Sequence, residues 1–196
     1  GPIVIVHTND VHCAVDENLG YAKLVNYVEA MRSMYGADNV ALVDAGDAVQ
    51  GKAISTLSDG EYLVDIMNEC GYDLAIPGNH EFDYGMTRFN TLVACAKAKY
   101  LSCNFTDLRT GNLMLDPYVI RTYETSAGTK KVAFLGICTP ETLTKSSPVS
   151  FQDGNGAYIY GFCEDDSGAK LYEAVQRTVD QARDVDGADF VVALAH

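Results

Sequence analysis

Five side chains that could bind a metal ion each follow closely after a short apolar segment of the chain. They carry carboxylate oxygens, an amide oxygen or imidazole nitrogens, and they are Asp10, His12, Asp47, Asn79 and His196. Mixed oxygen and nitrogen ligands without thiolates suit Zn, Mn, Fe or Co better than copper(I) or an iron–sulfur cluster. The two oxygens of the Asp47 carboxylate can bridge two cations about 4 Å apart. This pattern predicts a site for two divalent metal ions.

The apolar segments before these side chains are short, which is typical of buried strands. They span residues 3–6, 40–43, 74–76 and 189–195. Asp10 and His12 are expected to alternate along the chain, so that both face one site while Val11 points away. In an open α/β sheet, ligands bind outside the carboxyl ends of the strands. We therefore expect the candidate ligands to meet at one rim.

Apolar residues recur at helical spacing in four further segments, residues 20–35, 61–70, 86–97 and 167–184. Gly71 is expected to end the second of these helices, and Ser167 to cap the fourth. Strands that alternate with helices indicate the α/β class. The sequence therefore predicts a layered α/β sandwich with mixed, largely parallel central sheets.

Three other segments complete the predicted fold. Residues 100–103 are expected to form a strand. Residues 118–124 and 131–137 indicate a hairpin around a turn at residues 126–129, which adds antiparallel strands. Residues 140–166 are rich in Ser, Gly, Asp and Tyr and show no clear period, so we expect a long surface excursion there.

The composition excludes several classes of protein. The chain has 196 residues, with 14 Lys and Arg against 27 Asp and Glu, and a formal charge of −13. A hydrophobic fraction of 47% excludes disorder, and no apolar run is long enough to span a membrane. The negative charge disfavours nucleic acid as a partner. The six cysteines form no C-x-x-C pair, so buried free thiols are expected rather than a disulfide framework.

Each candidate has a plainer interpretation when it is taken alone. Asp10, Asp47 and Asn79 are common turn or helix-capping residues. His7 ends a predicted strand and is expected to be a structural histidine with its hydrogen bonds satisfied. Coincidence at four separate strand ends is improbable, however, and the set taken together favours a metal site.

The motifs around these residues resemble those of the calcineurin-like metallophosphoesterases. The shared motifs are Asp10-x-His12, Gly46-Asp47, Gly78-Asn79-His80-Glu81 and the strand that ends in His196. Residues 7–12, 46–51 and 77–85 are similar to the 5′-nucleotidase branch in particular. The resemblance covers nearly the whole chain.

The resemblance implies a role for each residue. Asp10 and His12 would ligate the first metal ion and Asp47 would bridge both ions. The second ion would be held by Asn79 and His196. His80 would lie over the scissile phosphate without binding metal, oriented by Asp83, which favours its protonated form.

The chain departs from the family in two respects. Cys13 stands where the family usually has Gly, and we expect it to be a passive small residue. The family also has a G-H-x-[HQN] segment that gives each metal one more ligand, and a C-terminal domain that holds the nucleoside.

We expect residues 1–2 to be a tag scar. Residues 3–196 are expected to form a partial catalytic domain that ends before the last metal-ligand segment. Such a fragment is expected to be inactive, with an empty metal site or a single poorly coordinated ion.

The implied reaction is metal-dependent hydrolysis of phosphate esters, with nucleoside 5′-phosphates as the favoured substrates. A 2′,3′-cyclic-nucleotide phosphodiesterase or a UDP-sugar hydrolase of the same fold is the alternative, and a non-catalytic metal-binding surface module is the alternative of another class. The implied partners are two divalent metal ions, a small phosphorylated substrate and the missing C-terminal domain. The resemblance implies an extracellular, periplasmic or cell-surface location.

Overall fold

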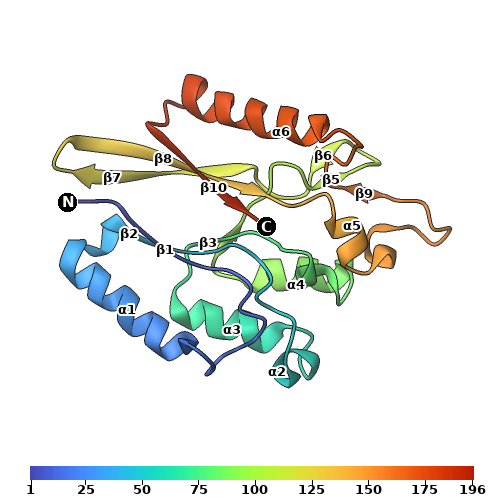
Figure 1. Ribbon diagram of the computed structural model, residues 1–196, viewed down its shortest axis with the longest axis horizontal. Helices are drawn as coiled ribbons and strands as arrows, with labels where there is room; N and C mark the ends of the chain where they lie inside the picture. Colours follow the sequence, from blue (N-terminus) through green and yellow to red (C-terminus); the bar gives the residue numbers. More distant parts are fainter.

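Four parallel strands form the first sheet of the computed structural model, which describes residues 1–196 (Figure 1). Their order is the sequence order, β1 (Val4–Thr8), β2 (Val40–Asp44), β3 (Leu74–Ala75) and β4 (Lys99–Tyr100). Thr8 pairs with Asp44, and Asp44 pairs with Ala75, so the first three strands end side by side. The predicted strands are confirmed, although β4 is shorter than residues 100–103.

Helices cover the outer face of this sheet (Figure 1). They are α1 (Gly20–Tyr35), α3 (Glu61–Cys70) and α4 (Met86–Cys95), while the short α2 (Ala53–Thr56) packs against α3. The predicted bounds of α1 and α3 are confirmed, and Gly71 ends α3 in the left-handed conformation at φ 75°. The helix predicted over residues 86–97 ends two residues early, because Ala96 is extended at ψ 133°.

A second, mixed sheet packs against the first. Its order is β10 (Phe190–Ala195), β8 (Gly128–Ile137) and β7 (Tyr118–Thr125), with β10 parallel and β7 antiparallel to β8. Ala41 and Val43 of β2 face this sheet and pack with Phe134 and Leu194, whereas Leu42 faces the helices. α6 (Ala169–Asp180) covers the outer side of the second sheet (Figure 1). The layered, mixed α/β fold is thereby confirmed.

The interpretation of residues 140–166 as a surface excursion is only partly correct, since residues 153–158 are exposed but other parts of the segment are buried. The segment forms α5 (Thr142–Lys145), a 3₁₀ turn at Pro148–Phe151 and β9 (Tyr160–Gly161). β9 joins a small antiparallel sheet with β5 (Thr106–Asp107) and β6 (Asn112–Leu113). Phe151 and Phe162 are 0% exposed. They contribute isolated aromatic side chains to the core, which a search for periodicity does not detect.

The capping role predicted for Ser167 falls mainly to a neighbouring residue. α6 begins at Ala169, and the Asp165 carboxylate accepts the amides of Ala169 at 3.1 Å and Lys170 at 2.8 Å. The Ser167 hydroxyl accepts only the Ala169 amide, at 3.2 Å.

No helix in the structure has the length and apolarity required to cross a bilayer.

Candidate metal centre

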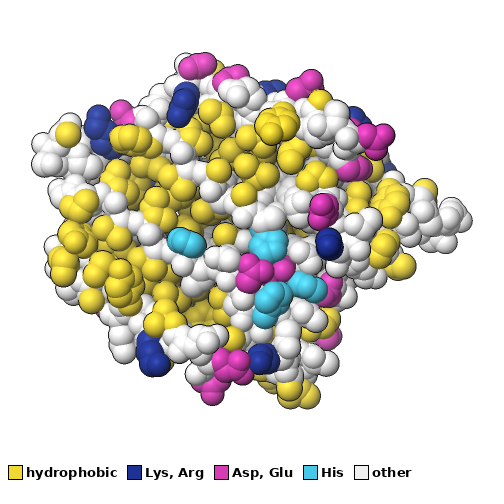
Figure 2. Space-filling view, in the orientation of Figure 1, with side chains coloured by type: hydrophobic (Ala, Val, Ile, Leu, Met, Phe, Trp, Pro, Cys, Tyr) yellow, Lys and Arg dark blue, Asp and Glu magenta, His cyan; other side chains and the backbone are white.

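Three of the candidate ligands converge where β1, β2 and β10 end. Ligand atoms of Asp10, Asp47 and His196 lie within 4.8 Å of one another. His196 Nε2 is 3.1 Å from Asp47 Oδ2. Figure 2 shows histidine and acidic side chains gathered on this face of the molecule. The expected convergence of strand ends thus brings together residues from distant parts of the sequence.

His12 lies at the edge of the same cluster. Its Nε2 atom is 3.7 Å from Asp10 Oδ1 and 3.8 Å from Asp47 Oδ2. Asp10 and His12 face one site, as expected, but both residues have positive φ, 52° and 46°, instead of the alternating backbone of a strand. Both side chains reach the site from a left-handed turn instead. Such strained backbone is concentrated at functional sites.

Hydrogen bonds between main chains fix this turn against the one after β2. The amides of Asp10 and His12 donate to the carbonyls of Gly46 and Asp47 at 2.9 and 3.0 Å, and the Cys13 amide donates to Ala48 at 3.0 Å. Cys13 is buried with φ 59°, a conformation that suits Gly and agrees with its replacement of Gly in the motif. Burial raises the pKa of its thiol, which indicates a passive residue.

The imidazoles of His12 and His196 are oriented as metal ligands usually are. Nδ1 of His12 lies 3.0 Å from the Gln50 carbonyl, and Nδ1 of His196 lies 2.9 Å from the Ala45 carbonyl. In the neutral ring these bonds place the proton on Nδ1 and leave the Nε2 lone pair directed at the carboxylates. The donor set therefore fits a divalent cation.

His196 is anchored on both sides of its backbone, although it is the last residue. Its amide donates to the Ile137 carbonyl at 3.1 Å, and its carbonyl accepts the Thr139 amide at 2.6 Å. Burial would raise the pKa of the Asp47 carboxyl, but hydrogen bonds from His196 and from the His80 amide outweigh burial and hold that pKa below its ordinary value. The hydrogen bond to Asp47 raises the pKa of His196 to about 9. A proton on His196 thus occupies the position that a cation would take.

Asn79 lies in a turn whose backbone is held against Asp47. The His80 amide donates to Asp47 Oδ1 at 2.8 Å. A Cβ atom added to Gly78 would lie 2.7 Å from the Asp47 amide nitrogen, and one added to Gly46 would lie 2.7 Å from the Gly78 amide nitrogen. Glycine is required at both positions for this close approach, and Gly46 also turns the chain at φ 94°. Asn79 is half-buried, and its side chain makes no hydrogen bond within the protein.

His80 and Asp83 form a pair beside the cluster. Nδ1 of His80 lies 2.6 Å from Asp83 Oδ2, and the Ser146 hydroxyl donates to Asp83 Oδ1 at 3.0 Å. The His80 ring lies 5.3 Å from the His12 ring, centroid to centroid. Burial lowers the pKa of His80, but the hydrogen bond to Asp83 and the nearby carboxylates raise it more, so the net pKa is above its ordinary value. This arrangement favours a protonated imidazole with Nε2 available as a donor.

Two buried carboxylates, Asp44 and Glu81, support the site, and the sequence analysis assigned neither of them a role. Asp44 accepts the Thr8 hydroxyl at 2.7 Å and the Gly46 amide at 3.0 Å. Glu81 accepts amides from the turns after β2 and β3. The available signal for Glu81 was its position next to Phe82, an apolar residue that proves to be fully buried.

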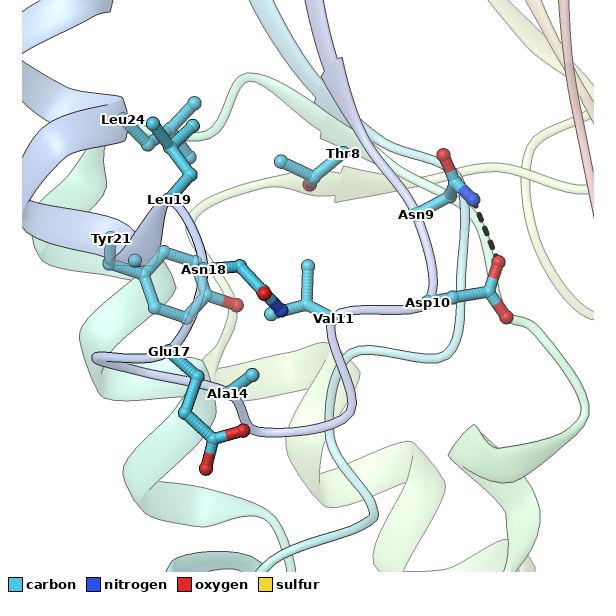
Figure 3. Close-up of a pocket in the computed structure, with 11 residues that line it drawn as sticks. Thr8, Asn9, Asp10, Val11, Ala14, Glu17, Asn18, Leu19, Tyr21 and Leu24 are labelled. Atoms are coloured by element: carbon cyan, nitrogen blue, oxygen red, sulfur yellow. Dashed lines mark hydrogen bonds between the residues drawn. The ribbon is translucent and has the colours of Figure 1, made fainter.

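Two hollows border the site. A cavity of about 200 Å³ lies between Asp10 and the beginning of α1. Figure 3 shows Asn9, hydrogen-bonded to Asp10, on one side of this cavity, and Leu19 and Tyr21 on the other side. A wider hollow of about 620 Å³ lies between β1 and β10 and includes His7. His7 is exposed and makes no side-chain hydrogen bond, so the expected structural role with satisfied hydrogen bonds is wrong.

Comparisons with known proteins agree with this geometry. The chain is 30% identical over 160 residues to the snake venom 5′-nucleotidase of Gloydius brevicauda, which covers 74% of this chain and 27% of that protein. It is 27% identical over 222 residues to the 2′,3′-cyclic-nucleotide 2′-phosphodiesterase/3′-nucleotidase of Salmonella typhimurium, covering 98% of this chain and 31% of that protein. The chain thus spans less than a third of the length of these relatives.

A solved structure and a family profile also relate the chain to phosphoesterases. The structure of the 5′-nucleotidase precursor from Thermus thermophilus superposes with a TM-score of 0.72 and 26% identity, over 98% of this chain and 36% of that one. The sequence profile described as calcineurin-like phosphoesterase matches residues 3–128, most of the chain. The chain therefore belongs to the calcineurin-like phosphoesterase family.

Proposed function

We propose that this chain forms the metal-binding part of a phosphohydrolase that cleaves nucleoside 5′-phosphates. The observation that carries the proposal is the convergence of Asp10, Asp47 and His196, with the His80–Asp83 pair beside it. Acidic and imidazole ligands next to a protonated imidazole are what hydrolysis of a phosphate ester requires. The relatives named as nucleotidases support a nucleotide substrate.

Five residues would hold two divalent ions. Asp10 and His12 would bind the first, Asn79 and His196 the second, and Asp47 would bridge them. The ions, when bound, supply Lewis acids that neutralise charge on the phosphoryl oxygens and lower the pKa of water. Zn, Mn, Fe and Co all suit these ligands.

The residues around the ions have distinct tasks. The Asp47 carboxylate, already held in its charged form by His196, provides negative charge at the centre of the site. His80 in its protonated form donates a proton toward the leaving alkoxide oxygen. Asp83 orients the imidazole by fixing the proton on Nδ1, so that Nε2 faces the substrate. Ser146 in turn holds Asp83.

Other substrates and a different class of function remain as alternatives. The relative from Salmonella typhimurium, which covers nearly the whole chain, favours a cyclic-nucleotide phosphodiesterase as the second candidate. UDP-sugar hydrolysis would use the same ligands. A non-catalytic metal-binding module would require only the metal ligands. The presence of the His80–Asp83 pair beside them therefore disfavours this alternative.

We also propose that residues 3–196 are part of a longer catalytic domain. A further segment after His196 would add ligands to both metal ions, and a C-terminal domain would hold the nucleoside. Export of the protein fits the relative from snake venom. On this view, the 196-residue chain alone binds metal weakly and turns over little substrate, because its coordination shells are incomplete.

A substrate panel tests the proposal. The chain and a longer protein carrying the sequence that follows His196 are each assayed with Mn²⁺ or Zn²⁺ on AMP, a 2′,3′-cyclic nucleotide, UDP-glucose and an aryl phosphate. We expect the longer protein to prefer AMP and the chain alone to be nearly inactive. Preference for the cyclic nucleotide would favour the second candidate. No metal-dependent hydrolysis by the longer protein would exclude a phosphohydrolase.

A further inference from the structure

The Glu81 carboxylate is bound entirely by backbone amides. Its Oε2 atom accepts the amides of Gly78 at 2.6 Å and Asp47 at 2.8 Å. Its Oε1 atom accepts the amides of Ala48 at 2.8 Å and Val49 at 3.3 Å. Glu81 is 3% exposed, and no Lys, Arg or His pairs with it. Four amide donors offset part of the cost of burying this carboxylate, although burial and the nearby Asp47 still raise the pKa of Glu81 above its ordinary value.

These amides belong to two separate turns. Asp47, Ala48 and Val49 follow β2, whereas Gly78 follows β3, and the two turns carry the candidate ligands Asp47 and Asn79. Besides Glu81, the hydrogen bond between the His80 amide and Asp47 Oδ1 joins the turns. That second bond uses a carboxylate oxygen of the proposed bridging ligand. Glu81 thus connects the two turns without using a metal-ligating atom.

The position of Glu81 is fixed from the opposite side. It lies in the 3₁₀ turn His80–Phe82, and the next residue, Phe82, inserts into an aromatic cluster. The Phe82 ring centroid is 4.5 Å from that of Phe89 and 5.2 Å from that of Phe105. Packing in this cluster holds the backbone of the turn, so the Glu81 carboxylate is presented to the amides from a rigid base.

We propose that Glu81 is a positioning residue that sets the distance between Asp47 and Asn79 before any metal binds. The proposal rests on the proposed function only in its final step, the effect on metal affinity. Because the clamp consists of amide hydrogen bonds, it exists in the metal-free chain. If the spacing of the two ligands is already formed, metal binding does not incur the entropy cost of ordering both turns, and the affinity for metal is higher.

Glutamine cannot replace Glu81 in this role. Its side chain has the same shape, but one of the two acceptor oxygens becomes an NH₂ group that would face the amides it should accept. Glu81→Asp keeps the charge and loses one methylene of reach. Glu164→Gln is a matched control, because the Glu164 carboxylate also accepts a backbone amide, that of Phe162 at 2.7 Å, but outside the site.

Amide hydrogen exchange of the metal-free wild-type chain is the first test, since it needs no variant to fold. We expect the amides of Asp47, Ala48 and Gly78 to be protected without metal. Exchange of these amides at the rate of unprotected loops, with protection only after Mn²⁺ is added, would overturn the proposal.

Mn²⁺ titration of the variants, followed by paramagnetic broadening of amide signals near Asp47, is the second test. We expect Glu81→Gln and Glu81→Asp to need roughly 10- to 100-fold more Mn²⁺, the usual effect of losing a residue that supports a metal ligand. Glu164→Gln should match wild type. A folded Glu81 variant with wild-type protection and affinity would overturn the proposal. If wild type shows the protected amides but no broadening with Mn²⁺, the metal site fails and the clamp stands.

Discussion

His196 Nε2 lies 3.1 Å from Asp47 Oδ2, closer than His12 Nε2 lies to either Asp10 or Asp47. The contact joins the end of the last strand to the turn after β2. The imidazole is held from behind by the Ala45 carbonyl and the carboxylate by the His80 amide. This pair therefore has a defined geometry before any cation arrives.

The first prediction concerns the proton on His196. Its pKa in the folded metal-free chain is about 9, against an ordinary value of 6.5, because of the hydrogen bond to Asp47. Since the folded pKa is raised, the stabilisation by this pair is fully present below the unfolded pKa and is lost as pH rises through 9. NMR titration of the His196 ring should give a pKa near 9 in wild type and a value near the ordinary one in Asp47→Asn. Equal values in both proteins would contradict the contact.

A second prediction concerns the alkaline limb of the pH–rate profile. Asp83 raises the pKa of His80, and a proton donor is lost as pH rises through that pKa. In the longer protein, Asp83→Asn should therefore move the fall in kcat to lower pH, while Asp153→Asn, at a loop away from the site, should leave it in place. An unchanged profile in Asp83→Asn would show that His80 does not act as the acid.

Part of this fold was predictable because the signals were local. The bounds of α1 and α3 follow from side-chain periodicity and from Gly71, and the strand ends follow from short apolar runs. The residues that meet at Asp47 were also identifiable, since each follows such a run. Local sequence carries this information because period and turn chemistry depend on neighbouring residues.

The remainder depends on contacts between distant segments. The amide clamp at Glu81 and the left-handed turn at Asp10 and His12 arise from hydrogen bonds to another turn, which no local pattern records. The burial of Phe151 and Phe162 depends on partners far away in the sequence, such as Phe105. Periodicity fails in residues 140–166 because single side chains, not a helical face, enter the core.

A third prediction tests the close approach of the two turns. A Cβ atom at Gly78 would collide with the Asp47 amide nitrogen, so Gly78→Ala should destabilise the chain by about 1–3 kcal/mol. Its Mn²⁺ affinity should fall roughly tenfold or more. Gly154→Ala is the control, because an added Cβ there meets no atom within 4 Å. Denaturant unfolding and Mn²⁺ titration measure both effects, and equal behaviour of the two variants would disprove the close approach.

A fourth prediction tests the burial of the segment at residues 140–166. Phe162→Ala should lower the free energy of unfolding by about 3–5 kcal/mol, since it empties a fully buried aromatic position. Tyr172→Ala, at an aromatic side chain that is 78% exposed, should change it by less than about 0.5 kcal/mol. Urea unfolding followed by circular dichroism gives both values. A small effect of Phe162→Ala would mean that the segment lies on the surface after all.

Anomalous diffraction from Mn²⁺-soaked crystals tests the central claim, that Asp47 lies between two metal ions. In the longer protein we expect two peaks about 3.5–4 Å apart, one beside Asp10 and His12 and the other beside Asn79 and His196. His80→Asn should keep both peaks while its turnover falls roughly 10²- to 10⁴-fold, and Asp47→Asn should lose metal. Absence of any peak beside Asp47, or loss of metal in His80→Asn with both ions retained in Asp47→Asn, would contradict the account.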